Sequence, residues 1–468
     1  MYDTIIIGAG MSGLAAGIRL AHFEQRVCIL ERHYTIGGLN SFYRLRGRDY
    51  DVGLHAVTNF TPKGARKGPL ARILRQLRIR WDDFALAPQR HSVIAFPGVR
   101  LQFGNGLEQI EAAVADAFPG EIDRFRRLCG AILDYDELDD LDRFAQSTRA
   151  RLGEFIRDPL LREMLLCPTM WYGNARERDM DFGQFSIMFR AIFMEGFARP
   201  FAGVRLILKH LVRKYRRLGG ELKLRSGVKR IIVEQGRAVG VETESGEILT
   251  ARRIVSSAGL VETLRLCDDH CRTSVPEPGQ MSFTEVVMVL DCQPEQLGHE
   301  ATIIFFNDGA EFRWERPRGA WCDLSTGVIC SPNNFDYPHD AALQDGIVRI
   351  TSPADFALWQ NASEPEYAAA KRTWQARIVE SAVRFVPDFR HRVVDADMFT
   401  PSTIRRFTWH EHGAVYGSPE KRLDGKTHLP NLFLCGNDQG FVGIVGAMVS
   451  GLSIANRYCL REDEPGGM

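Results

Sequence analysis

The chain has 468 residues, of which 45% are hydrophobic and 25% charged, and its 59 Lys and Arg residues balance 59 Asp and Glu residues. This length favours two domains, and the absence of net charge argues against a dedicated nucleic-acid-binding protein. The ten cysteines form no CxxC pair, so a metal site is not expected, and the closest pair, Cys267 and Cys271, is interpreted as two half-buried thiols. With no disulfide pattern and no signal peptide, we expect a reducing, cytoplasmic location.

The N-terminal segment predicts a strand at 3–7, a glycine-rich turn at 8–13, a helix at 14–23 and a second strand at 26–30 that ends on Glu31. This βαβ unit with a GxGxxG turn is typical of a dinucleotide site rather than of a purely structural turn. Gly8 permits the tight turn, Gly10 lets a pyrophosphate approach, and Gly13 lets helix and strand pack closely. The helix N-terminus attracts the phosphates, and Glu31 can accept hydrogen bonds from a ribose. The predicted contacts in this unit are Gly8, Gly10, Met11, Ser12, Gly13 and Glu31.

The following segment separates FAD from NAD. Gly37-Gly38 let the backbone lie flat against a larger cofactor, and a strand expected at 50–55 carries Asp51, Gly53 and His55. Both features resemble the GG motif and the D-x-G stretch of the FAD-dependent amine oxidase and phytoene desaturase superfamily. The resemblance implies a non-covalently bound FAD, in contact with Arg32, Gly38, Leu39, Asn40, Gly53, Leu54 and His55.

Residues 63–80 are expected to form a basic amphipathic helix. They include seven Lys and Arg residues and no acid, and Leu70, Ile73, Leu74 and Leu77 recur at helical spacing. One interpretation is a solvated surface helix. The other is docking on an anionic membrane surface, which would make the protein peripheral on the inner face of a membrane.

An aromatic segment follows, with a phenylalanine at every third or fourth position, which predicts one helical stripe. Its members are Phe182, Phe185, Phe189, Phe193, Phe197 and Phe201. The stripe is either plain core or one wall of an apolar substrate tunnel, since Phe and Met side chains tolerate long lipidic ligands.

The strand pattern resumes at 221–259 as a β-meander that ends in a small-residue turn, and alternating strands between 281 and 359 predict an antiparallel sheet. A long helix is expected at 364–386. The resemblance places Val228 against adenine and Ala258 beneath the cofactor. The expected fold class is α/β, with a Rossmann-like FAD-binding domain of β/β/α layers (1–80, 203–275 and 405–468). A discontinuous α+β substrate-binding domain with an antiparallel sheet would comprise 81–202 and 276–404.

The C-terminal part contains a buried strand at 431–435, a glycine turn with an acid, and a glycine-rich helix start. Asp438 can accept hydrogen bonds from ribityl hydroxyls, and the helix N-terminus can stabilise charge on a reduced flavin ring. The combination resembles the carotenoid isomerase and retinol saturase branch of the phytoene desaturase-like flavoproteins. The resemblance assigns to the cofactor Gly436, Asp438, Gly443, Val445 and Gly446.

Three polar residues are candidates for catalysis: His55, His410 and Glu411. The last two lie in a polar and aromatic segment, 408–417, that resembles a flavin-proximal wall of the same family. A metal site at His410-Glu411-His412 is not expected, because adjacent residues on one element point apart. For His55 a packing role is an equal alternative.

No second GxGxxG follows position 60, which argues against an internal NAD(P)H domain. The resemblance implies an FAD-dependent oxidoreductase that desaturates, saturates or isomerises an apolar isoprenoid or polyene, as in carotenoid biosynthesis, by hydride transfer at flavin N5. Quinone or O2 is the expected electron acceptor. Alternatives are an amine oxidase or protoporphyrinogen-type oxidase that uses O2, or a flavin-binding scaffold without turnover.

Overall fold

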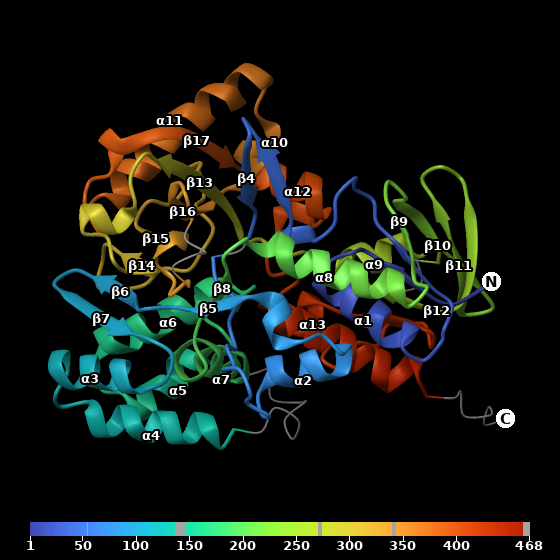
Figure 1. Cartoon of the computed structure of the whole chain (residues 1–468), viewed down its shortest axis with the longest axis horizontal. Helices are drawn as coiled ribbons and strands as arrows, with labels where there is room; N and C mark the ends of the chain where they lie inside the picture. The colour runs from blue at the N-terminus through green and yellow to red at the C-terminus, as the bar shows by residue number, and fades with distance from the viewer. Residues whose placement is uncertain (54, 136–145, 270–273, 339–342, 462–468) are drawn as a thin grey trace.

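The computed structural model describes residues 1–53, 55–135, 146–269, 274–338 and 343–461 (Figure 1). Within them lie two seven-stranded sheets and two short two-stranded antiparallel sheets. The short sheets pair β3 with β4 (Phe42–Leu45, Arg48–Asp51) and β5 with β8 (Leu86–Pro88, Ala198–Pro200).

The first sheet is mainly parallel and is built from the N-terminal unit, the meander and the last strand. Its strands are β1 (Tyr2–Ile7), β2 (Val27–Leu30), β9 (Glu221–Lys223), β10 (Val228–Glu234), β11 (Arg237–Thr243), β12 (Ile248–Ser256) and β18 (Leu432–Leu434). The order is β10-β11-β12-β1-β2-β9, with β18 paired to β12. Strand β1 lies parallel between β12 and β2, whereas β10 and β11 are antiparallel.

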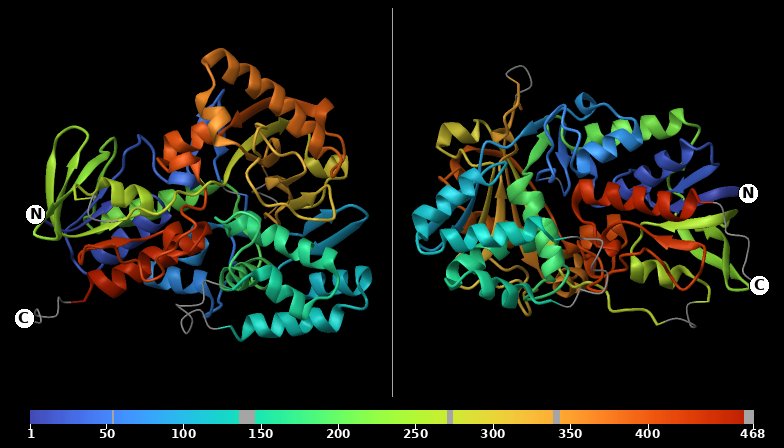
Figure 2. Two further views of the ribbon diagram at one scale, coloured as in Figure 1. Left: turned by 180° about the vertical axis from the view of Figure 1, so that it is seen from behind. Right: turned by 90° about the horizontal axis from the view of Figure 1, so that it is seen from below.

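The alternation of side chains along β1 explains the layers of this half. Ile6 belongs to the core that includes residues of the helices α1 (Met11–Ala21), α2 (Pro69–Leu77), α8 (Val204–Arg217) and α13 (Gly443–Ile454), whereas Ile5 and Ile7 belong to the core formed with the meander. Successive strand residues point to opposite faces, so one apolar strand supplies both interfaces. The result is the expected β/β/α arrangement. In Figure 2 the meander lies at one end of the molecule and the second sheet at the other.

The second sheet is antiparallel except between β14 and β6, and its order is β17-β13-β16-β15-β14-β6-β7. Its strands are β6 (Ser92–Phe96), β7 (Val99–Phe103), β13 (Ser282–Leu290), β14 (Ile303–Asn307), β15 (Thr326–Cys330), β16 (Gly346–Ala354) and β17 (Val393–Phe399). Helix α11 (Glu364–Ala382) covers one face through Trp374 and Ile378. The α/β fold class with a second, antiparallel sheet is therefore confirmed, while the domain boundaries stay a prediction.

A helical layer packs against the other face of the second sheet. It comprises α3 (Glu108–Ala117), α4 (Ile122–Leu133), α5 (Thr148–Phe155), α6 (Pro159–Gly173) and α7 (Phe182–Phe189). Three further short helices are α9 (Leu260–Leu266), α10 (Phe356–Asn361) and α12 (Pro401–Thr408). In the described residues, no helix has the length and apolar character that a membrane span requires.

Two predicted elements differ from the structure. The strand expected at 50–55 ends at Asp51, because the Gly53 N–H turns to the Leu39 carbonyl (3.0 Å), where any Cβ would press on that oxygen. The aromatic segment is not one helix: α7 ends at Phe189 and continues as a π-helical turn, Arg190–Met194. The sequence also contains an acidic cluster at 134–140, which predicts a solvated face; its residues 136–140 lie outside the described residues.

Candidate functional site

A deep pocket is lined by residues of both sheets. One wall comes from the turn after β1, the Gly37-Gly38 turn and the β18–α13 connection, and the other from β13, β15, β16 and the end of α6. Most residues predicted to contact FAD line it: Gly8, Gly10, Met11, Ser12, Glu31, Arg32, Gly38, Leu39, Asn40, Gly53, His55, Val228, Ala258, Gly436, Asp438 and Gly443. Gly13, Val445 and Gly446 do not line it, and Leu54 lies outside the described residues.

The three glycines of the first turn have different roles. Gly8 has a positive φ of 95°, which favours glycine. A Cβ at Gly13 would overlap the Gly8 carbonyl oxygen, so Gly13 serves helix–strand packing and not the pocket. A Cβ at Gly10 would meet no atom within 4 Å. That open space lies at the N-terminus of α1, and it therefore fits a pyrophosphate group.

The Glu31 carboxylate is fixed at the tip of β2. Its two oxygens accept hydrogen bonds from the backbone N–H groups of Ala9 (2.8 Å) and His33 (2.9 Å). Burial raises the pKa of Glu31, and these N–H groups oppose that shift. A carboxylate has about four acceptor sites, so acceptor capacity remains for a ribose diol. The geometry at this end of the pocket fits the adenosine half of FAD.

At the C-terminal turn, the structure changes the role of Asp438. Its carboxylate accepts hydrogen bonds from the backbone of Leu260 (2.5 Å) and Ser418 (2.8 Å) and from Lys421 (3.3 Å). It thereby ties three segments together, and its expected bond to a ribityl hydroxyl stays a prediction. Sequence reasoning missed the preceding residue, Asn437, which also lines the pocket and whose side-chain amide donates to the Val415 carbonyl (2.8 Å).

A buried polar cluster lies in the pocket wall around His55. His55 Nε2 is 3.2 Å from Glu285 Oε2 and 3.1 Å from Thr351 Oγ1. The other Glu285 oxygen is ion-paired with Arg349, whose guanidinium also donates to the Val52 carbonyl (2.9 Å). Glu285 and Thr351 are direct partners in the β13–β16 register. The second sheet thus supplies the groups that orient a histidine of the N-terminal segment.

The charges within this cluster follow from burial and pairing. Burial raises the pKa of Glu285, but the Arg349 and His55 contacts outweigh it, so the net pKa is lowered. Burial lowers the pKa of His55 more than the neighbouring carboxylate raises it. At neutral pH we therefore expect an ionised Glu285 and a neutral His55. Because a carboxylate only accepts, the His55 proton lies on Nε2 and the lone pair on Nδ1.

The other two catalytic candidates, His410 and Glu411, differ in their position relative to the pocket. His410 lines the pocket, with Nδ1 3.6 Å from Glu262 Oε1. Burial lowers the pKa of His410, but Glu262 and Asp438 together raise it above its ordinary value. Glu411 is absent from the lining, because its carboxylate is ion-paired with Arg265. The geometry gives no support to a direct catalytic role for Glu411.

Sequence comparison identifies the protein class. The family model described as flavin containing amine oxidoreductase matches residues 11–458. The chain belongs to this family. It is an FAD-dependent oxidoreductase, and the FAD prediction is confirmed at the level of the family.

Two relatives of this flavoenzyme match over nearly its full length. All-trans-retinol 13,14-reductase from Danio rerio is 24% identical, with 97% of this chain and 86% of the relative covered. Prolycopene isomerase from Arabidopsis thaliana is 23% identical, with 98% and 82% covered. The resemblance to the retinol saturase and carotenoid isomerase branch is thereby confirmed.

Solved structures share the fold of the flavoenzyme. An oxidoreductase from Methanosarcina mazei superposes with a TM-score of 0.67 at 15% identity, covering 97% of this chain and all of that chain. A putrescine oxidase variant superposes with a TM-score of 0.63 at 16% identity, covering 97% and 98%. At these identities the similarity establishes the fold alone.

The end of the pocket that faces the second sheet is aromatic. Trp171, Tyr172, Phe283 and Tyr416 line it, and the Tyr416 hydroxyl donates to the Trp171 carbonyl. Among the described residues the buried Tyr172 hydroxyl has no hydrogen-bond partner. The phenylalanine stripe lies elsewhere: five of its members are buried in the helical core, and Phe201 is exposed. No phenylalanine of the stripe lines the pocket, so the tunnel-wall interpretation was wrong and the plain-core interpretation holds; Phe197 meets the pocket wall only indirectly, by stacking on Tyr172.

The basic helix is shorter than expected, from Pro69 to Leu77, because Gly68 and Arg78 adopt positive φ at its ends. Its apolar residues Leu70, Ile73 and Leu74 are buried against α13 and the rest of the core. This face is therefore not free to enter a membrane. Only the charged side chains of the segment remain for a membrane contact.

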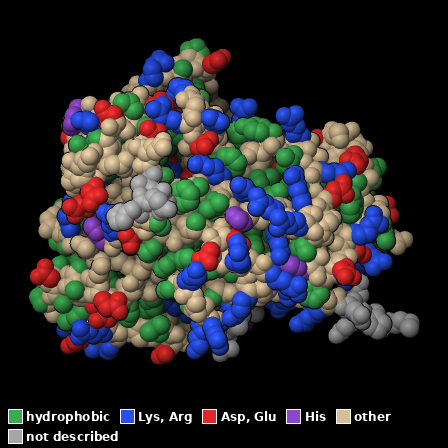
Figure 3. Space-filling model, in the orientation of Figure 1, with side chains coloured by type: hydrophobic (Ala, Val, Ile, Leu, Met, Phe, Trp, Pro, Cys, Tyr) green, Lys and Arg blue, Asp and Glu red, His purple; other side chains and the backbone are tan. Residues whose placement is uncertain are grey.

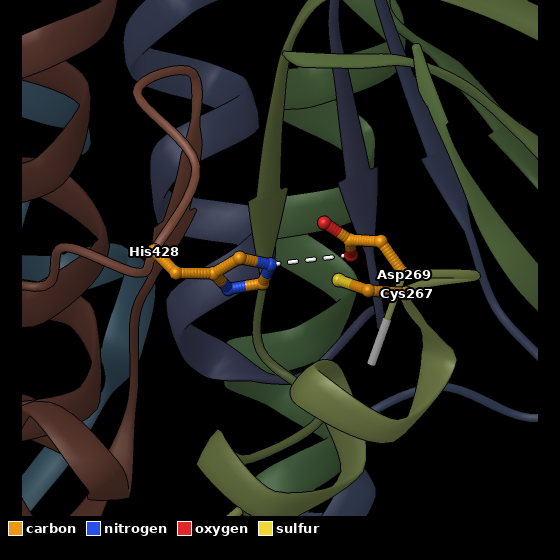
Figure 4. Close-up of side chains that lie close together, drawn as sticks. All are labelled: Cys267, Asp269 and His428. Atoms are coloured by element: carbon orange, nitrogen blue, oxygen red, sulfur yellow. Dashed lines mark hydrogen bonds and ion pairs between the residues drawn. The ribbon is translucent and has the colours of Figure 1, made fainter. Parts of the chain in front are cut away.

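One cluster outside the pocket carries metal-ligand residue types. Cys267, Asp269 and His428 converge, and the His428 ring is 3.2 Å from the Asp269 carboxylate (Figure 4). Burial raises the pKa of Cys267 to about 12, so the thiol keeps its proton. The His428 ring and the Asp269 carboxylate already contact each other, and we assign no metal to this cluster. Cys271, the expected neighbour of Cys267, lies outside the described residues.

The residues that sequence reasoning missed are mainly Glu285, Arg349 and Thr351. Glu285 and Arg349 are single charges within apolar strands of β-branched residues. A charge in such a strand is costly unless it is paired. That signal was available in the sequence, although it does not reveal the partner.

Proposed function

We propose that this flavoenzyme transforms carbon–carbon double bonds of an apolar isoprenoid or polyene, by desaturation, saturation or cis–trans isomerisation. The observation that carries the proposal is the aromatic end of the pocket, continuous with the residues that fit FAD. Flat, rigid side chains suit a conjugated or unsaturated chain. The names of the two relatives, a retinol reductase and a prolycopene isomerase, point to the same substrate class.

When bound, FAD accepts or supplies a hydride at N5. Making or reducing a C=C bond removes or adds two hydrogens, so each hydride needs a matching proton. The protein must therefore hold a proton donor or acceptor that is buried with the substrate.

His55 is the group that meets this need. It lines the pocket, and the hydrogen-bond contacts of its ring in the described chain go to Nε2. Glu285 holds the proton on Nε2, so Nδ1 can take a proton from a substrate carbon in desaturation and return it in saturation. In isomerisation the same proton is taken and returned, with no net redox change. Arg349 keeps Glu285 ionised, which fixes the tautomer throughout.

Net desaturation sends an electron pair to an acceptor, for which we propose quinone or O2. Net saturation requires a donor that supplies an electron pair to the flavin. Desaturation starts from neutral His55 and saturation from protonated His55, so the same residue serves either reaction provided that His55 takes up a proton from solvent before saturation.

The test is anaerobic titration of the FAD-loaded protein with a phytoene-type carotene and then with a primary amine. Loss of the oxidised flavin absorbance with the carotene, or reoxidation of photoreduced flavin by it, is the expected result. His55→Gln should keep the bound-flavin spectrum and lose this reaction. Bleaching with the amine alone would overturn the proposal, and no change with either compound would leave a flavin-binding scaffold.

Amine oxidation is the second candidate, with protoporphyrinogen-type oxidation as a variant of the same O2 chemistry. Two tyrosines, Tyr172 and Tyr416, lie at the aromatic end, where they could flank an amine. The His55–Glu285–Arg349 cluster argues against it, because the buried Glu285 carboxylate is already paired with Arg349 and therefore does not attract a substrate ammonium. The amine arm of the titration separates the two functions.

A further inference from the structure

A second concave surface lies outside the cofactor pocket, along the exposed side of α8. Its floor is apolar and consists of Ile36, Phe42, Leu208 and Val212. Its rim is basic throughout and consists of Arg205, Lys209, Arg213, Arg216 and Arg217. We call it the α8 groove. It is open at the surface, unlike the pocket between the sheets.

The rim charges are held at a cost to the helix. Arg205, Lys209, Arg213 and Arg217 follow one another at intervals of four residues, and like charges at this spacing destabilise a helix. Only Arg205 has a carboxylate within reach in the described chain, Asp49 at 3.7 Å. The other rim side chains form no ion pair or hydrogen bond with any described residue. Binding of an anionic ligand would offset the repulsion among these positive side chains and thereby stabilise α8.

The positive surface continues beyond the groove onto α2. Lys214 Nζ donates to the Arg78 carbonyl (3.1 Å), which joins the ends of the two helices. Figure 3 shows Lys and Arg side chains gathered over α8 and α2, although the whole chain has no net charge. Burial lowers the pKa of nearby His22, and Lys214 and Arg78 lower it further. The basic surface thus extends from the groove to the C-terminal end of α2.

We propose that the α8 groove docks the protein on an anionic lipid bilayer. The rim side chains would bind lipid phosphates, and the apolar floor would accept part of an acyl chain. Phe201, 40% exposed just before α8, adds an apolar side chain beside this helix. A nucleic acid would not use an apolar floor, and a basic rim around apolar side chains matches an anionic amphiphile. The membrane contact expected for residues 63–80 thus moves to α8, with α2 as its charged border.

The test is flotation of the full-length protein with phosphatidylcholine vesicles and with mixed phosphatidylcholine–phosphatidylglycerol vesicles, without substrate. We expect binding to the mixed vesicles only, and loss of binding at high ionic strength. Arg213→Glu combined with Arg217→Glu should weaken the partition coefficient by at least about tenfold, since each basic residue near an anionic surface contributes about 1 kcal/mol.

The matched control reverses two exposed basic residues outside the groove, Arg237→Glu with Lys426→Glu, and should bind like the native protein. Leu208 is buried, so the floor is tested with Val212→Ser, which should reduce binding to the mixed vesicles at low ionic strength, where the native protein binds. Equal flotation of the native and rim variants would overturn the proposal. The proposal would also be overturned if the native protein bound neither kind of vesicle while a soluble acidic protein bound the rim. None of these readouts depends on the reaction that the enzyme catalyses.

Discussion

His55 Nε2 lies 3.2 Å from Glu285 Oε2, although the two residues are 230 positions apart in the chain. The contact joins the N-terminal segment to the second sheet at the pocket wall. Its energy depends on Arg349, because a buried carboxylate without a cation is strongly destabilising.

Glu285→Gln should therefore cost about 3–5 kcal/mol in the free energy of unfolding, since it leaves the Arg349 guanidinium buried without its counter-charge. Denaturant unfolding of the FAD-loaded protein measures the change. Asp388→Asn, which breaks an exposed ion pair with Arg390, is the control and should leave the midpoint unchanged. The double change Glu285→Leu with Arg349→Met should regain most of the stability but none of the activity. Equal loss in the double variant would contradict this account.

Substitutions at two of the three glycines of the first turn, Gly10 and Gly13, should separate folding from cofactor binding. Gly10→Ala adds a methyl group into open space at an ordinary φ of −74°, so stability without FAD should not change. FAD affinity should fall by tenfold or more, because the methyl group occupies the pyrophosphate position, as quenching of flavin fluorescence would show. Gly13→Ala should destabilise the protein even without FAD, because its Cβ meets the Gly8 carbonyl oxygen. If Gly10→Ala lowered stability but not FAD affinity, and Gly13→Ala did the opposite, the placement of the pyrophosphate at Gly10 would be wrong.

Acid should destabilise the protein through His299. Burial lowers its pKa from 6.5 to about 4. Between these values the unfolded chain binds a proton that the folded chain does not, so stability is lost as the pH falls below about 6.5. The full difference corresponds to about 3 kcal/mol. His299→Gln should flatten the dependence of unfolding free energy on pH in this window, whereas the exposed His391→Gln should follow the native curve.

Tyr172→Phe tests whether the unpartnered hydroxyl contacts substrate. Without ligand the change should be neutral or stabilising by about 1 kcal/mol, because it removes a buried hydroxyl that lacks a partner. If the hydroxyl binds substrate, KM should rise while the flavin spectrum is kept. Tyr416→Phe is the counterpart: it loses the bond to the Trp171 carbonyl and should cost stability by about 1 kcal/mol. Equal stability effects in both variants would contradict the distinction.

Local features of the sequence correctly predicted the N-terminal βαβ unit and most of the residues that it contributes to the pocket. The roles of Gly8, Gly13 and Glu31 depend on neighbours within one βαβ unit, so spacing alone places them. The Glu285–Arg349 pair could not be placed in this way, because it depends on the register between β13 and β16, and on a segment from the N-terminal end. The phenylalanine stripe shows the opposite error. Helical spacing predicts that side chains share a face, but it does not tell a pocket from a core.

The Gly37-Gly38 turn and the α8 groove share a wall. A Cβ at Gly37 would lie 2.9 Å from the Leu208 side chain, and Leu208 forms part of the groove floor, while Gly38 lines the pocket on the other side. Thermodynamic linkage then applies. A lipid that moves Leu208 changes the affinity for FAD by some factor, and FAD changes the affinity for that lipid by the same factor. Membrane attachment and FAD binding would therefore each change the affinity for the other, without any domain movement.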